Sequence, residues 1–105
     1  MQFALDCENR KFWFGVNGTF YNSGNPATGA NPTWDTTDIP ADGEIVPYAQ
    51  GYKISGATAF QFNFGNGYFG TTAVSSAGTN ASNNGIFEYD VPSGFTALST
   101  KGLNL

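Results

Sequence analysis

The sequence has no histidine and only one cysteine, and these two shortages exclude much of ordinary enzyme chemistry. Histidine is the usual general base near neutral pH and the commonest metal ligand in proteins. The thiol of Cys7 has no imidazole partner anywhere in the chain, so a Cys–His nucleophile is excluded. A single cysteine also rules out a disulfide within the chain. Because Cys7 continues the alternation of Phe3 and Leu5, we expect it to be a small buried apolar side chain.

Charge is also scarce, since the 105 residues include four Lys and Arg against eight Asp and Glu, for a net charge of −4. A nucleic-acid ligand needs a basic stripe that so few cations cannot build. The same shortage disfavours an anionic membrane surface. No apolar run approaches the ~20 residues that span a bilayer, and no signal peptide precedes Phe3. We therefore expect neither nucleic acid nor a membrane as the partner.

Aromatic residues and glycines are what the chain has in abundance. Aromatic residues make up 16% of the chain, with 10 Phe, and there are 14 Gly. Many aromatic residues and little charge argue against disorder. Frequent Gly, Asn and Ser favour short strands joined by turns, and no long stretch repeats with the helical period. The sequence therefore predicts one all-β domain over residues 1–105.

Alternating apolar positions predict several strands. The strongest turn signal is Asn17-Gly18, because both residues tolerate the positive φ of a type I′ hairpin turn. Segment 57–64 has the clearest alternation, and Pro47 would confine segment 44–50 to a sheet edge or a bulge. The expected strands cover residues 3–7, 11–16, 19–21, 44–50, 57–64 and 86–91.

The same alternation predicts which side chains form the core. Phe12 and Phe14 share one face of their strand and Trp13 lies on the other, in a second layer. Loops 22–43 and 70–85 should lie on the surface and hold contact residues. The predicted buried cluster consists of Phe12, Phe14, Phe60, Phe62, Phe64, Phe87 and Tyr89.

Acidic residues gather in segment 35–44, at Asp35, Asp38, Asp42 and Glu44. Calcium prefers several carboxylate and carbonyl oxygens, but the spacing is not that of an EF-hand loop. Capping of turns by carboxylates is the alternative explanation.

Two further pairs of acidic residues, Glu88 with Asp90 and Asp6 with Glu8, each occupy alternate positions and so share one face of one predicted strand. A glycoside hydrolase would need two carboxylates across a sugar site. Acids on one face of one strand fit the solvated side of a half-buried strand instead. We expect no enzyme activity and no cofactor.

Aromatic side chains outside the predicted core are the candidate ligand-contact residues, because exposed aromatic rings are typical of protein hot spots and sugar-stacking platforms. These candidates are Trp34, Tyr21, Tyr48, Tyr52 and Tyr68.

Two patches resemble SPRY domains, especially those encoded by bacteriophages. One patch combines Phe-Gln-Phe-Asn-Phe-Gly at 60–65 with Pro-Ser-Gly-Phe-Thr-Ala-Leu at 92–98. The other is the hairpin 4–19, in which Leu-Asp precedes an aromatic strand and an Asn-Gly turn. Ser-Gly-Asn-Pro-Ala-Thr-Gly at 23–29 is similar to the phage versions in particular. The chain departs from the family at its start, because a whole SPRY domain has several strands before this hairpin.

The resemblance implies an antiparallel β-sandwich of the concanavalin-like jelly-roll kind, complete only if further strands are supplied. It also implies a non-enzymatic interaction module in a virion, such as a tail-fibre, tail or capsid-decoration component released by host lysis. Its partners would be other virion subunits or copies of itself. A lectin-like binder of host glycans and a purely structural self-assembling subunit are the alternatives. Sheet edges left open by the missing strands would need a neighbouring chain, so we expect the free monomer to be unstable.

Overall fold

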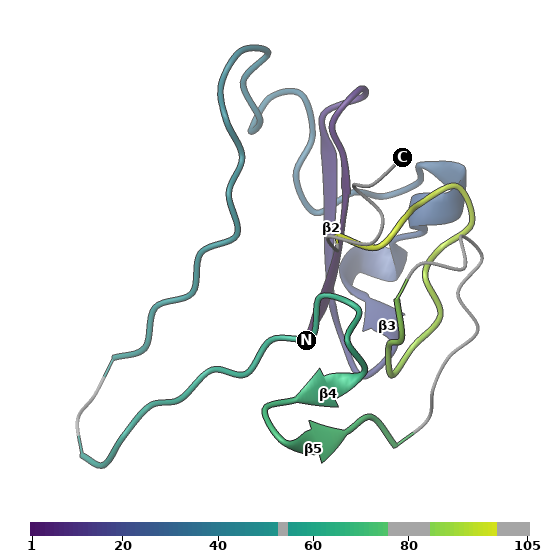
Figure 1. Ribbon diagram of the computed structural model, residues 1–105. Coiled ribbons are helices and arrows are strands. Elements are labelled where there is room, and N and C mark those ends of the chain that lie inside the picture. Colours follow the sequence, from purple (N-terminus) through teal and green to yellow (C-terminus); the bar gives the residue numbers. More distant parts are fainter. Residues whose placement is uncertain (53–54, 76–84, 99–105) are drawn as a thin grey trace.

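The computed structural model describes residues 1–52, 55–75 and 85–98, and within them the chain is antiparallel β without an α-helix (Figure 1). The predicted all-β class is therefore confirmed. One sheet has three strands in the order β1-β2-β3, and the other has the two strands β4 and β5. The elements are β1 Gln2–Asp6, β2 Lys11–Val16, β3 Thr19–Phe20, the 3₁₀ turns η1 Tyr21–Ser23 and η2 Pro26–Thr28, β4 Tyr68–Phe69 and β5 Thr72–Ala73.

The β1–β2 hairpin follows the predicted pattern closely. Strand β2 covers the predicted residues 11–16, and its register places Phe3 opposite Phe14 and Leu5 opposite Phe12. Asn17 and Gly18 have φ of 52° and 83°, so the predicted positive-φ turn between β2 and β3 is confirmed. These local features form because each is decided by residues that are neighbours in the sequence.

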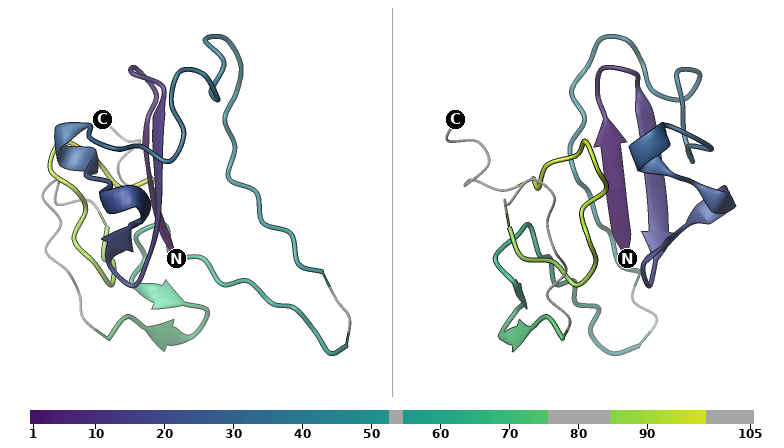
Figure 2. Two further views of the ribbon diagram at one scale, coloured as in Figure 1. Left: turned by 180° about the vertical axis from the view of Figure 1, so that it is seen from behind. Right: turned by 90° about the vertical axis from the view of Figure 1, so that its right-hand side faces the viewer.

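Trp13 is the centre of the core. Its side chain is 0% exposed, and Ala4, opposite it on β1, is also buried. The indole Nε1–H donates a hydrogen bond to the carbonyl oxygen of Ala30 at 2.8 Å, and the ring of Phe95 meets it edge-on at 6.0 Å between centroids. A Cβ at Gly24 would lie 2.8 Å from Trp13 Cδ1, so only glycine fits there. The turns η1 and η2 and segment 85–98 all lie on this side of the hairpin (Figure 2).

The buried face of the hairpin is the opposite of the predicted one. We expected Phe3, Leu5 and Cys7 to be inside, but Phe3 is 46% exposed and Cys7 is exposed, because β1 ends at Asp6. Alternation alone could not choose, because both faces of β2 carry aromatic side chains. The small residue Ala4 opposite Trp13 leaves room for the indole, and a nearby carbonyl accepts its N–H.

The strands predicted at 44–50, 57–64 and 86–91 are wrong. The described residues there have no strand assignment beyond isolated bridges, one of which joins Ile86 to Asn66. The predicted single cluster of Phe12, Phe14, Phe60, Phe62, Phe64, Phe87 and Tyr89 is wrong too, since none of its members is buried. An alternating segment becomes a strand only when a partner strand takes up its backbone groups, and the described chain offers 57–64 no such partner.

The loops also differ from the prediction. Segment 22–43 is partly core, because Pro26 and Ile39 are buried. The hairpin β4–β5 lies partly in segment 70–85, where we expected only a loop. Gly70 has φ 61° between the two strands, which suits the first position of a type II′ turn. The rest of that predicted loop, 76–84, lies outside the described residues.

Residues 40–52 and 55–62 are the two limbs of what we call the arm, and they leave the compact part of the molecule and return to it (Figures 1 and 2). The limbs approach each other at Gly51, where an added Cβ would collide with the side chain of Thr58. The radius of gyration is 14.6 Å, against roughly 13 Å for a compact domain of this length. The arm therefore extends the molecule beyond what its core requires.

Trp13→Ala should cost ~3–5 kcal/mol of unfolding free energy, because it leaves a cavity at the centre of the core. Phe62→Ala should cost ~1 kcal/mol or less, since that ring is already half exposed. Urea denaturation followed by circular dichroism measures both. Equal costs would contradict the placement of the core on the Trp13 face.

Gly18→Ala should destabilise the protein more than Gly94→Ala. The two glycines have nearly the same φ, 83° and 86°, so the backbone strain of an added Cβ is matched. At Gly18 that Cβ would also lie 3.0 Å from the ring of Tyr89, whereas at Gly94 it meets nothing within 4 Å. The difference between the two melting temperatures measures the Tyr89 contact, and equal temperatures would show that it is absent.

Asp6→Ala should lower the melting temperature at neutral pH but not in acid. The backbone N–H and then the side-chain amide of Asn9 donate to the carboxylate and hold the pKa of Asp6 below its ordinary value. A lowered pKa stabilises the fold above the unfolded-state pKa, and this stabilisation is lost as the pH falls through the folded-state pKa. The gap between wild type and variant should therefore close on acidification. Asn9→Ala keeps the backbone donor and should show a smaller gap of the same kind.

Candidate functional site

The outer face of the β1–β2 hairpin, turned away from Trp13, carries a group of exposed aromatic side chains. Alternation along the strands places Phe3 and Leu5 of β1 and Phe12 and Phe14 of β2 on this side. Two further aromatic residues join them from the loop that follows. We call the set of Phe3, Leu5, Phe12, Phe14, Tyr21 and Trp34 the outer aromatic face.

Backbone pairing holds Trp34 in this position. The N–H of Phe12 donates to the carbonyl of Trp34 at 3.0 Å, and the N–H of Thr33 donates to the carbonyl of Phe12 at 2.7 Å. The N–H of Phe14 donates to Thr33 Oγ1 at 3.1 Å. Residues 33–34 thus continue the third strand position beside β2, and the side chain of Trp34 lies next to the ring of Phe12.

The rings on this face stack nearly parallel to one another. Phe12 and Trp34 are 4.8 Å apart with an angle of 19° between their planes, and Phe14 and Tyr21 are 5.3 Å apart at 17°. Phe3 stacks on Phe12 at 6.1 Å and 23°. Tyr21 is 52% exposed and Trp34 51%, so half of each side chain remains open to a ligand. The sheet holds these rings as two flat stacks.

The outer aromatic face carries no ionisable side chain apart from the phenol of Tyr21. Asp6 and Lys11 alternate to the opposite side of the hairpin, where Lys11 Nζ donates to the carbonyl of Gly29 at 2.8 Å. Asp35 follows Trp34 in the chain, and its carboxylate accepts hydrogen bonds from the backbone and hydroxyl of Thr37, which lower its pKa. The face therefore suits an apolar or stacking ligand and offers no acid–base chemistry.

The structure separates the five predicted contact residues. Tyr21 and Trp34 lie together on the outer aromatic face. Tyr48 and Tyr52 are exposed on the arm, and Tyr68 is exposed on β4. The phenylalanines of the outer aromatic face were not among the predicted contact residues, because their alternation had placed them in the predicted core. The small residues opposite and beside Trp13 were the signal that could have placed them outside.

The first part of the acidic segment, residues 35–38, is a turn capped by its own carboxylates. Asp35 Oδ1 accepts from Thr37, and Asp38 Oδ2 accepts from the backbone N–H of Asp35 at 3.2 Å. Among the described residues no three His, Cys, Asp or Glu side chains gather in a way that could hold a metal ion. Glu88, expected on the solvated strand face, instead accepts from the backbone N–H at 2.7 Å and the hydroxyl of Ser75.

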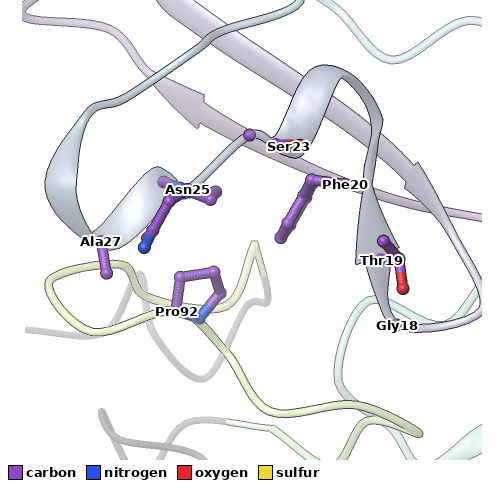
Figure 3. A pocket seen from close by; sticks show the side chains of 9 residues that line it. Gly18, Thr19, Phe20, Ser23, Asn25, Ala27 and Pro92 are labelled. Carbon is purple, nitrogen blue, oxygen red and sulfur yellow. The ribbon is translucent and has the colours of Figure 1, made fainter.

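A shallow pocket of about 430 Å³ lies beside β3, η1 and η2. Figure 3 shows Phe20, Asn25 and Pro92 among its lining side chains. None of the lining residues is charged, and several are glycine or alanine. The polar side chains of its lining are those of Thr19, Ser23 and Asn25.

No family model matches this chain, and no curated protein or solved structure matches it either. Within residues 1–52, 55–75 and 85–98, no helix is long and apolar enough to cross a membrane. The resemblance to SPRY domains therefore rests on the sequence motifs described above.

Proposed function

We propose that this chain is a non-enzymatic interaction module that binds its partner through the outer aromatic face. The observation that carries the proposal is the pair of half-exposed rings, Trp34 and Tyr21, each stacked on a phenylalanine of the sheet. Aromatic side chains held rigidly on a scaffold lose little conformational entropy on binding and dominate hot spots.

The exposed aromatic area is large enough to matter for affinity. An indole side chain presents ~250 Å², and covering half of it at ~25 cal/mol per Å² contributes ~3 kcal/mol. That is ~100-fold in the dissociation constant. Trp34 alone is thus a candidate anchor residue, and Tyr21 extends the contact along the sheet.

The biological setting that we propose is a bacteriophage virion, with the module in a tail fibre, a tail or a capsid decoration and its partners other virion proteins or copies of itself. The motifs at 4–19, 60–65 and 92–98 support this setting by their similarity to phage SPRY domains. In the same proposal the complete fold is an antiparallel β-sandwich of the SPRY kind, and the small sheets described here form part of it.

A lectin-like role is the second candidate, with host glycans as ligands. The observation that favours it is the near-parallel stack of Phe12 and Trp34, because flat aromatic surfaces bind the apolar faces of sugar rings. The same residues would serve both functions, so the two candidates differ in the ligand and agree on the site.

Trp34→Ala should weaken ligand binding ~100-fold, because it removes the proposed anchor. Two probes separate the candidates: a glycan array for the lectin, and peptides selected from a displayed random library for protein recognition. Tyr68→Ala is the control, because Tyr68 is exposed on β4, away from the outer aromatic face. Binding that survives Trp34→Ala but is lost with Tyr68→Ala would move the site to the β4–β5 hairpin.

A further inference from the structure

The arm has backbone groups that no other part of the described chain takes up. Residues 40–52 and 55–62 neither donate nor accept a backbone hydrogen bond within the described structure. The backbone is nevertheless extended over much of this length (Figure 1). An extended segment with unpaired N–H and C=O groups is a template for pairing with another strand.

The returning limb of the arm, together with the two residues that follow it, is also apolar on one side. Phe60, Phe62 and Phe64 occupy alternate positions, and their rings stack at 6.3 Å and 5.7 Å between centroids. Phe62 is 49% exposed, and its two neighbours in the stack are exposed to a similar degree. No charged residue occurs in 45–52 or 55–64. The limb thus has the side-chain pattern of a strand with one aromatic face, but within the described structure it pairs with no other strand.

The β1–β2 hairpin has a strand edge beside which such a segment can pair. Among the strands of the described residues, β1 is at the edge of the sheet β1-β2-β3, and the outer aromatic face begins at that edge with Phe3 and Leu5. A strand added beside β1 would place every second side chain on the outer aromatic face. Phe60, Phe62 and Phe64 have that spacing, so they would extend the stacked rings by one more row.

We propose that the partner of the outer aromatic face is a second copy of this chain, whose residues 57–64 add to the outer edge of β1 and lay their phenylalanines beside Phe3 and Leu5. This inference rests on the proposed function and names the occupant of its site. Each copy has one arm and one face, so two copies can exchange arms about a two-fold axis and form the contact twice.

Charge at the two surfaces does not oppose a second copy as the occupant. The chain has a net charge of −4, so two copies repel each other wherever acidic surfaces meet. Neither segment 57–64 nor the aromatic side chains of the outer aromatic face carry an acidic or basic group. Two copies can therefore join at these surfaces without bringing carboxylates together.

The arm's own ends argue against its closing on the sheet of the same chain. Ile39 donates its backbone N–H to Asp35 at 2.9 Å, and its carbonyl accepts from Arg10 at 3.2 Å. At the other end Asn63 Nδ2 donates to the carbonyl of Ile86 at 2.8 Å. Between these anchors the outgoing limb leaves the compact part and the returning limb comes back to it, so much of the arm reaches out from the molecule (Figures 1 and 2).

Sedimentation velocity from about 1 to about 100 µM tests the proposal. The wild-type chain should self-associate, and Phe62→Ser on the arm and Phe3→Ser at the β1 edge of the face should each raise the dimer dissociation constant at least ~10-fold. Tyr68→Ser is the matched control, because Tyr68 is 48% exposed against 49% for Phe62 and lies outside both surfaces. Circular dichroism reports that each variant is folded.

Amide hydrogen exchange of the wild type at low and high concentration provides a second measurement that needs no variant. Association should protect the amides of 57–64 and of β1 together. A wild type that stays monomeric to 100 µM, or association that Phe62→Ser leaves unchanged, overturns the arm exchange. Neither result bears on binding of peptides or glycans to Trp34, which decides the proposed function separately.

Discussion

The burial of one indole determines the arrangement of the rest of this structure. Trp13 fills the inner side of the β1–β2 hairpin, and its N–H is satisfied by the carbonyl of Ala30. That hydrogen bond requires the chain after β3 to fold back over the hairpin, which the 3₁₀ turns η1 and η2 accomplish. Gly24 allows the backbone to approach the ring closely enough. A buried indole without an acceptor would cost the desolvation of its N–H, so ring and loop stabilise each other.

This choice of inner face determines what the other face can do. Because successive side chains of a strand point to opposite faces, β2 exposes Phe12 and Phe14 when it buries Trp13. The small sheet cannot cover these two rings. They are partly covered by Trp34 and Tyr21, whose own outer halves stay exposed. The outer aromatic face is therefore a direct consequence of the core, because the same alternation that buries the indole exposes the phenylalanines.

The features that could be predicted from sequence are those decided by near neighbours. The span of β2 and the positive φ of Asn17 and Gly18 depend on adjacent residues, and both predictions are confirmed. The buried face of β2 was mispredicted, because alternation does not show which face meets Ala4 across the hairpin and the carbonyl of Ala30, 17 residues after Trp13. Segment 57–64 has the alternation of a strand, but alternation cannot supply the neighbouring strand that pairing needs. Trp34 and Tyr21 were chosen for being aromatic, and sequence could not show that they share a face.

The surplus of aromatic residues connects the small core with the binding proposals. With 16% aromatic and 11% charged residues, the chain has more rings than the inner side of a three-stranded sheet can enclose. The excess is organised, because the rings stack on the outer aromatic face and along the returning limb of the arm. Exposed apolar surface of this extent is rare in monomeric proteins unless it meets a partner. The same shortage of charge that leaves the stacked rings of the outer aromatic face free of carboxylates and ammonium groups therefore supports the proposed role in recognition.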